Sequence, residues 1–134
     1  MTGGVGAGDR GVLDTSVFIT EETDRHHGPL PRTAAISVVT IAELHLGVLM
    51  AEDPDVRARR LRTLSAVETA FEPLPIDVDV ARVFAEVVAE ARRQGRRPKI
   101  MDAWIAATAI AHDLPVYTQD DDFEVIPRVR TVRV

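Results

Sequence analysis

Hydrophobic residues follow two patterns along the chain, short continuous runs and longer helical stripes. Short apolar runs, typical of buried strands, lie at residues 11–19, 34–39 and 114–118, the first interrupted by an aspartate. The clearest helical stripe covers residues 78–94, where apolar side chains recur three and four positions apart. Residues 100–112 are alanine-rich and apolar nearly all round, which predicts a helix packed inside the protein.

Capping and breaking residues indicate where the other elements begin. Thr40 followed by Glu43 matches a capping box and predicts that a helix begins there. Pro54 suits the first turn of a further helix that extends to about residue 70. Residues 72–76 form a weak edge-strand candidate, because their two prolines cannot donate to a strand ladder.

Predicted strands therefore alternate with predicted helices. This order predicts a single α/β domain with a central, mostly parallel sheet flanked by helices. We place the domain at residues 11–134 and expect the glycine-rich residues 1–10 to be a flexible N-terminal lead. In such sheets ligands bind at the carboxyl ends of the strands, so candidate chemistry is expected there.

The composition excludes several classes of protein. With 46% hydrophobic residues the chain can bury a core, and without cysteine it has no disulfide framework, thiol nucleophile or zinc–sulfur site. No apolar run approaches the ~20 residues of a membrane span, and residues 1–10 do not resemble a signal peptide, so we expect a cytoplasmic protein that does not enter a membrane. The net charge of -5 argues against nonspecific binding to nucleic acid.

Four acidic residues follow the predicted strands or begin the predicted helices. They are Asp14, Glu43, Asp102 and Asp120. Because these positions share one edge of the predicted sheet, we expect the side chains to converge when the chain folds. Gathered carboxylates repel one another unless cations lie between them, and an all-oxygen ligand set suits Mg²⁺ or Mn²⁺ rather than zinc.

Each acid also has an ordinary structural interpretation. An aspartate after a strand, such as Asp14, is common in turns, and Glu43 can be the capping-box partner of Thr40. Asp102 can favour the positive end of its helix, although a carboxylate in so apolar a segment needs a partner. The joint placement of the acids, rather than any one of them, favours a metal site.

Four motifs surround these acids and occur in order along residues 11–134. They are LDTSVFI at Asp14, TIAEL at Glu43, MDAWIAATA at Asp102 and YTQDDDF at Asp120. Taken together, they resemble the motifs of PIN-domain ribonucleases, most of all the VapC-type toxins of bacterial toxin–antitoxin modules.

The resemblance implies an Mg²⁺- or Mn²⁺-dependent endoribonuclease that acts as the toxin of a type II toxin–antitoxin system. It implies that the four acids are catalytic and hold the metal, with Asp122 as a further ligand. Ser16 and Thr118 match hydroxyl positions that support the metal ligands. The implied partners are an RNA substrate and a cognate antitoxin, and we also expect a homodimer.

A basic stretch leads directly into the third motif. We interpret Arg96, Arg97 and Lys99 as RNA contacts that bind phosphates, the alternative being a solvated helix end and loop.

The helices at 40–51 and 55–70 are candidates for the walls of an antitoxin-binding groove. They carry the apolar residues Leu46, Val48, Leu49, Leu61 and Leu64. These side chains offer more apolar surface than one small core obviously uses. The alternative is that they fill the core or a homodimer interface.

Two other functions remain open at this point. One is a catalytically silent PIN-like module that binds RNA or protein, which the complete set of acids disfavours. The other is a receiver-type phosphoryl-transfer protein, which also gathers acids at strand ends. A receiver needs a lysine after a strand, whereas Lys99 follows a predicted helix.

Overall fold

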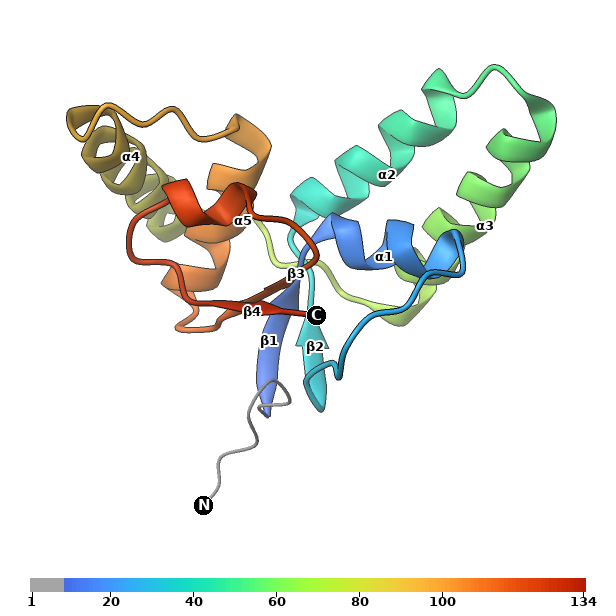
Figure 1. Cartoon of the computed structure of the whole chain (residues 1–134), viewed down its shortest axis with the longest axis horizontal. Coiled ribbons are helices and arrows are strands. Elements are labelled where there is room, and N and C mark those ends of the chain that lie inside the picture. Colours follow the sequence, from blue (N-terminus) through green and yellow to red (C-terminus); the bar gives the residue numbers. More distant parts are fainter. Residues whose placement is uncertain (1–8) are drawn as a thin grey trace.

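The centre of the structure is a sheet of four parallel strands in the order β2-β1-β3-β4 (Figure 1). The computed structural model describes residues 9–134. The strands are β1 (Arg10–Leu13), β2 (Thr33–Ala35), β3 (Val116–Thr118) and β4 (Thr131–Arg133). Helices flank this sheet, so the predicted α/β class is confirmed.

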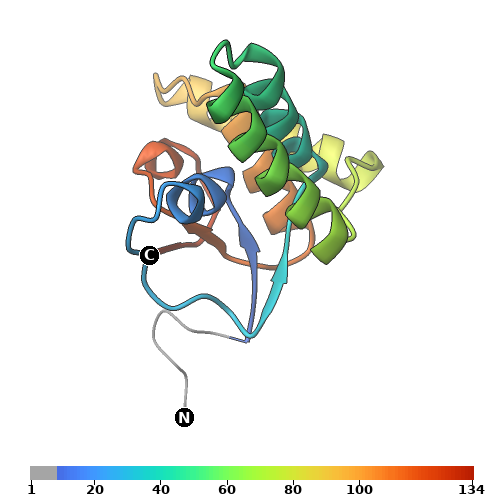
Figure 2. The same ribbon diagram turned by 90° about the vertical axis from the view of Figure 1, so that its right-hand side faces the viewer.

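Five α-helices and one short 3₁₀ helix complete the described part of the chain. They are α1 (Thr15–Glu22), α2 (Val38–Met50), α3 (Pro54–Ala70), α4 (Val78–Arg93), α5 (Ile100–Ala111) and η1 (Asp122–Val125). Helices α2 and α3 pack side by side as one pair, as Figure 2 shows, and α4 and α5 form another. In Figure 1 the α4–α5 pair lies on the left and the α2–α3 pair on the right, with α1 below the α2–α3 pair.

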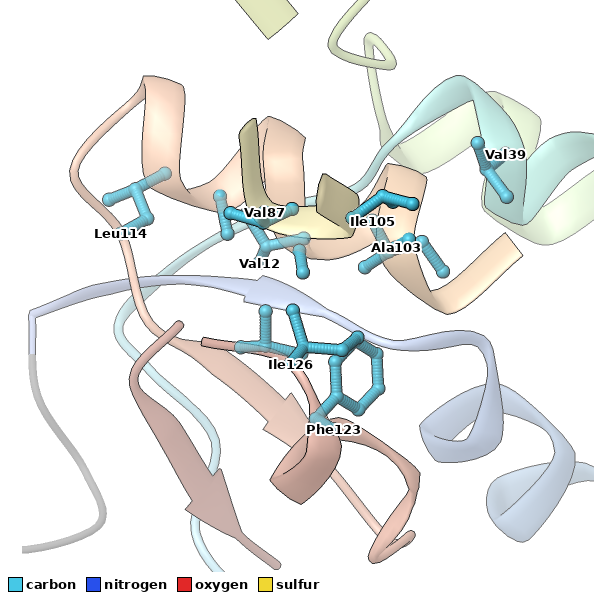
Figure 3. Packing of buried hydrophobic residues seen from close by; sticks show 12 residues of the cluster. Val12, Val39, Val87, Ala103, Ile105, Leu114, Phe123 and Ile126 are labelled. Carbon is cyan, nitrogen blue, oxygen red and sulfur yellow. The ribbon is translucent and has the colours of Figure 1, made fainter. Parts of the chain in front are cut away.

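The two central strands, β1 and β3, are buried on both faces of the sheet. Val12 packs against Val87 of α4 and Ile105 of α5 in one core, shown in Figure 3. The next residue, Leu13, points to the opposite face and joins Tyr117 in a second core built with α1, α2 and α3. Since successive strand residues face opposite sides, a continuous apolar run supplies both cores.

Helix α2 begins earlier than the sequence predicts. Its N-cap is Ser37, whose hydroxyl accepts the backbone N–H of Val39 at 3.0 Å. Thr40 lies inside the first turn and is fully buried. The predicted capping box of Thr40 and Glu43 is therefore wrong, and so is the predicted extension of the second strand to residue 39.

The remaining boundaries are close to those predicted. Helix α3 starts at Pro54, and α4 ends where Gly95 adopts a left-handed φ of 76°. Within residues 72–76 Leu74 forms only an isolated bridge, so the weak edge strand does not develop. Strand β1 begins at Arg10, one residue before the predicted domain, and most of the predicted lead (residues 1–8) lies outside the described residues.

None of the helices within residues 9–134 is long and apolar enough to cross a membrane. The cytoplasmic location stays a prediction.

Replacing Gly11 by alanine tests the close approach of β1 to Tyr117. A Cβ at this position would lie 2.6 Å from ring atom Cδ1 of Tyr117. Because this ring is buried in the second core, we expect Gly11→Ala to lower the free energy of unfolding by about 1–3 kcal/mol in urea melts. Gly47→Ala is the matched control, since its Cβ has no neighbour nearer than 3.8 Å and a helix favours alanine. Equal stability of both variants would contradict the argument.

Candidate functional site

A cavity of about 500 Å³ opens at the carboxyl edge of the sheet, between α1, α2 and the start of α5. We call it the acidic cavity. Five acids line it, namely Asp14, Glu43, Asp102, Asp120 and Asp122. They come from the ends of β1 and β3, from α2, from the first turn of α5 and from the start of η1. The fold thus brings together residues that are far apart in the sequence.

Asp14 is placed by the pairing of β1 with β3. Its backbone N–H donates to the carbonyl oxygen of Tyr117 at 2.9 Å, and its side chain is buried. Thr118 donates its hydroxyl to Oδ2 of Asp14 at 3.0 Å and accepts the backbone N–H of Asp120 at 3.0 Å. Ser16 in turn accepts the backbone N–H of Gln119 at 3.0 Å. The two hydroxyls expected to support the site therefore bind the carboxylate of Asp14 and the backbone that leads from β3 to Asp120.

Glu43 is held by Thr15, which the sequence analysis did not identify, and Thr15 in turn contacts Thr40. Thr15 donates its hydroxyl to Oε1 of Glu43 at 2.6 Å, and its Oγ1 lies 2.9 Å from Oγ1 of Thr40. Because Thr15 has one hydroxyl proton and gives it to Glu43, Thr40 donates to Thr15. The sequence analysis paired Thr40 with Glu43 as a capping box, whereas in the structure the two side chains are linked through the hydroxyl of Thr15.

Burial and the charges of neighbouring acids raise the pKa of two aspartates in the cavity, Asp102 and Asp120. Burial raises the pKa of Asp102 to about 7, and the nearby charges of Asp14, Asp122 and Glu43 add to the effect. Burial, with the charges of Asp14 and Asp122, also raises the pKa of Asp120. Oδ2 of Asp102 is buried without any hydrogen-bond partner among the described residues.

These features fit a divalent cation. The donors are all oxygen atoms, burial and the neighbouring acids raise the pKa of Asp102, and the buried oxygen of Asp102 lacks a partner, which a cation could provide. Within residues 9–134, however, no group of three or more histidine, aspartate or glutamate side chains is arranged so that it could hold a metal ion as it stands. That the acids hold a metal therefore stays a prediction.

Of the basic residues predicted to contact RNA, one lines the acidic cavity. Lys99 immediately precedes α5 and donates to Oδ2 of Asp122 at 2.8 Å, which raises the pKa of the lysine. Arg96 and Arg97 are exposed in the loop before it and do not line the cavity. Their role in RNA binding stays a prediction.

The apolar residues predicted to form a groove divide into two groups. Leu46, Leu49 and Leu61 are 55%, 66% and 50% exposed, and Leu46 lines the acidic cavity. Val48 and Leu64 are buried in the second core, so assigning them to the groove was wrong. The exposed leucines lie on α2 and α3.

Comparison with known proteins identifies the class to which this fold and site belong. Residues 11–129 match the PIN domain family. Ribonuclease VapC5 of Mycobacterium tuberculosis is 47% identical over 126 residues, 92% of this chain and 93% of the relative. Ribonuclease VapC4 of the same organism is 43% identical over 129 residues, 93% of this chain and 97% of the relative.

Solved structures agree. One is the crystal structure of VapBC-5 from M. tuberculosis, a member of the VapBC family of toxin–antitoxin systems. It superposes with a TM-score of 0.84 at 46% identity, covering 93% of this chain and 98% of that chain. FitAcB from Neisseria gonorrhoeae gives 0.73 at 27% identity, covering 91% and 96%. The chain therefore belongs to the PIN-domain family. Within that family its place is with the VapC-type ribonucleases.

Replacing Asp102 by asparagine tests the repulsion in the cavity. The pKa of Asp102 is higher in the folded state than in the unfolded chain, so folding takes up a proton between about pH 4 and 7. The free energy of unfolding therefore falls as the pH rises through this range. Without metal, Asp102→Asn should match the wild type near pH 4 and be more stable above pH 7. We expect a gain on the order of 1–2 kcal/mol, because water in the open cavity screens part of the repulsion.

Urea melts in the presence of a chelator, from pH 4 to pH 8, measure this difference. The control is Glu68→Gln, which removes an exposed acid of α3 and should change stability by less than about 0.5 kcal/mol at every pH. A constant difference between Asp102→Asn and the wild type would contradict the repulsion.

Proposed function

We propose that this chain is the endoribonuclease toxin of a type II toxin–antitoxin system and that it hydrolyses RNA with Mg²⁺ or Mn²⁺ held in the acidic cavity. One observation carries the metal: Asp102 has a buried oxygen without a partner and a pKa raised to about 7 among other acids. A bound cation removes both penalties at once. The names of the VapC relatives support ribonuclease activity.

The proposed metal ligands are Asp14, Glu43, Asp102 and Asp120, with Asp122 as a further ligand. When bound, the cation supplies charge neutralisation at the scissile phosphate and acidifies an attacking water. Thr118 fixes the carboxylate of Asp14 through its hydrogen bond. Asp122 is paired with Lys99, whose ammonium group is otherwise exposed to solvent at the mouth of the cavity.

The basic residues orient the RNA. Lys99 stands beside the acids, where its charge can contact a phosphate of the bound strand. Arg96 and Arg97 extend this positive charge along the loop before α5. The negative carboxylates and the positive loop thus have different tasks, the first to hold cations and the second to hold phosphates.

Asp14→Asn tests the metal centre. We expect the variant to lose RNA cleavage by more than about 100-fold and to bind Mn²⁺ more weakly in calorimetry, because a carboxylate ligand becomes neutral. Asp113→Asn, which alters an exposed acid beyond the far end of α5, should retain both properties. A chelator should abolish cleavage by the wild type.

Cleavage that persists in the chelator would contradict the metal-dependent mechanism. Mn²⁺ binding without cleavage of RNA by the wild type would favour the silent binding module instead.

We also propose a cognate antitoxin that covers the exposed leucines of α2 and α3. The VapBC-5 structure is of a member of a family of toxin–antitoxin systems. Leu46, Leu49 and Leu61 are exposed on α2 and α3, and Leu46 lines the acidic cavity. A partner segment lying there would block the entry of RNA. The homodimer stays a prediction, which light scattering of the purified chain can check.

Co-expression with the protein encoded by the adjacent gene tests the antitoxin. We expect a soluble complex without nuclease activity, and we expect Leu46→Asp with Leu49→Asp to weaken the complex by at least tenfold, because charges replace apolar contacts. Glu68→Gln is the control on the exposed surface of α3. Harmless high-level expression of the active chain alone would contradict the proposal.

A further inference from the structure

A second, smaller cavity of about 250 Å³ adjoins the acidic cavity. The two cavities share three lining residues, Ile19, Glu43 and Gly47. The smaller one is enclosed by α1, α2 and α3, and we call it the side cavity. A ligand in it would therefore lie immediately beside the acids proposed to hold the metal.

The polar groups of the side cavity have hydrogen-bonding capacity to spare. The Glu22 side chain is only 8% exposed, and its single ion pair joins Oε2 to Nε of Arg59 at 3.7 Å. This distance exceeds that of a hydrogen bond. No hydrogen bond between described residues uses the carboxylate of Glu22 or the guanidinium of Arg59. The Glu22 side chain is mostly enclosed, and a bound ligand can supply the hydrogen bonds that its carboxylate lacks.

The rest of the side cavity is lined by both apolar and polar residues. Ile19 and Leu44 supply aliphatic side chains, and Gly47 has no side chain to fill the space. Arg60 donates Nη1 to the carbonyl oxygen of Gly47 at 2.8 Å, which ties α3 to α2 at this wall. The polar lining consists of the side chains of Glu22, Glu43, Arg59, Arg60 and Thr23. Glu43, Arg60 and Thr23 make hydrogen bonds within the protein, so Glu22 and Arg59 are the pair available to a planar ligand with polar edges.

We propose that the side cavity binds a nucleobase of the RNA strand next to the scissile phosphate and that Glu22 and Arg59 select guanine. The inference rests on the proposed ribonuclease function. Guanine presents two N–H donors side by side, at N1 and N2, which match the two oxygens of a carboxylate. Its O6 acceptor lies next in line and suits the guanidinium.

The other bases do not offer this sequence of groups. Adenine and cytosine have a ring acceptor where guanine has N1–H, and a carboxylate repels it. Uracil has one N–H between two carbonyl oxygens, so only one carboxylate oxygen can be satisfied. The side cavity has about half the volume of the acidic cavity, so a base fits while its sugar and phosphate remain over the acids.

Mapping of cleavage sites tests the inference. The full-length proteins cleave a pool of single-stranded RNA of random sequence with Mn²⁺, and sequencing of the new ends gives the base frequency at each position around the cut. We expect the wild type to enrich guanine by about tenfold or more at one position fixed relative to the cut. Glu22→Gln should lose this enrichment and still cut other sequences at the wild-type rate.

Two further variants make the result specific. Glu21→Gln removes the neighbouring acid of α1, which pairs with His27 and does not line the side cavity, and it should keep the wild-type profile. Arg59→Lys keeps the charge at a partly exposed position but lacks the planar fork, so it should weaken the enrichment without affecting the fold in thermal melts.

An unchanged profile in Glu22→Gln, or a wild type without guanine enrichment, overturns the base-binding role and leaves the Glu22–Arg59 pair as a link between α1 and α3. Failure of every protein to cut RNA, the wild type included, overturns the ribonuclease function and this inference with it.

Discussion

Backbone pairing between β1 and β3 continues past the ends of both strands, because the N–H of Asp14 donates to the carbonyl oxygen of Tyr117. The register is fixed by burial, since a slip by one residue would exchange Val12 and Leu13 between the two cores. Asp14 and Thr118 therefore lie side by side at the ends of their strands. This places Asp14 close to the other acids, although their charges repel. Packing of the two cores keeps the acids close together, although their charges repel one another. The acids of the site therefore lower the stability of the fold.

The sequence was sufficient for the fold because each strand and helix carries its own local signal. Apolar runs, helical stripes and proline at a helix start are all read within a few neighbouring residues. The beginning of α2 was misplaced because both Ser37 and Thr40 can cap a helix, and only a contact across the fold decides between them. Thr40 faces Thr15, which is 25 residues away, and no local pattern encodes that meeting.

The acids themselves could be selected from their placement at strand ends, whereas the burial of apolar residues could not. Helix α2 is apolar over most of its surface, so its sequence does not show which face packs inward. The packing of α3 against it buries Val48 and leaves Leu46 and Leu49 exposed. Glu22 was missed for a similar reason, since an acid at the end of a helix is expected in water and only the approach of α3 encloses it.

The threonine pair behind Glu43 has a direction. With Glu43 ionised, protons point from Thr40 to Thr15 and on to the carboxylate, as the acceptor at the end of the chain requires. A proton placed on Oε1 of Glu43 would have to be donated back along the same path, and both hydroxyls would rotate. Thr40 is fully buried, and its hydroxyl is linked to Glu43 through Thr15. The magnetic resonance of this hydroxyl proton therefore reports the charge on Glu43, which Thr40 does not touch.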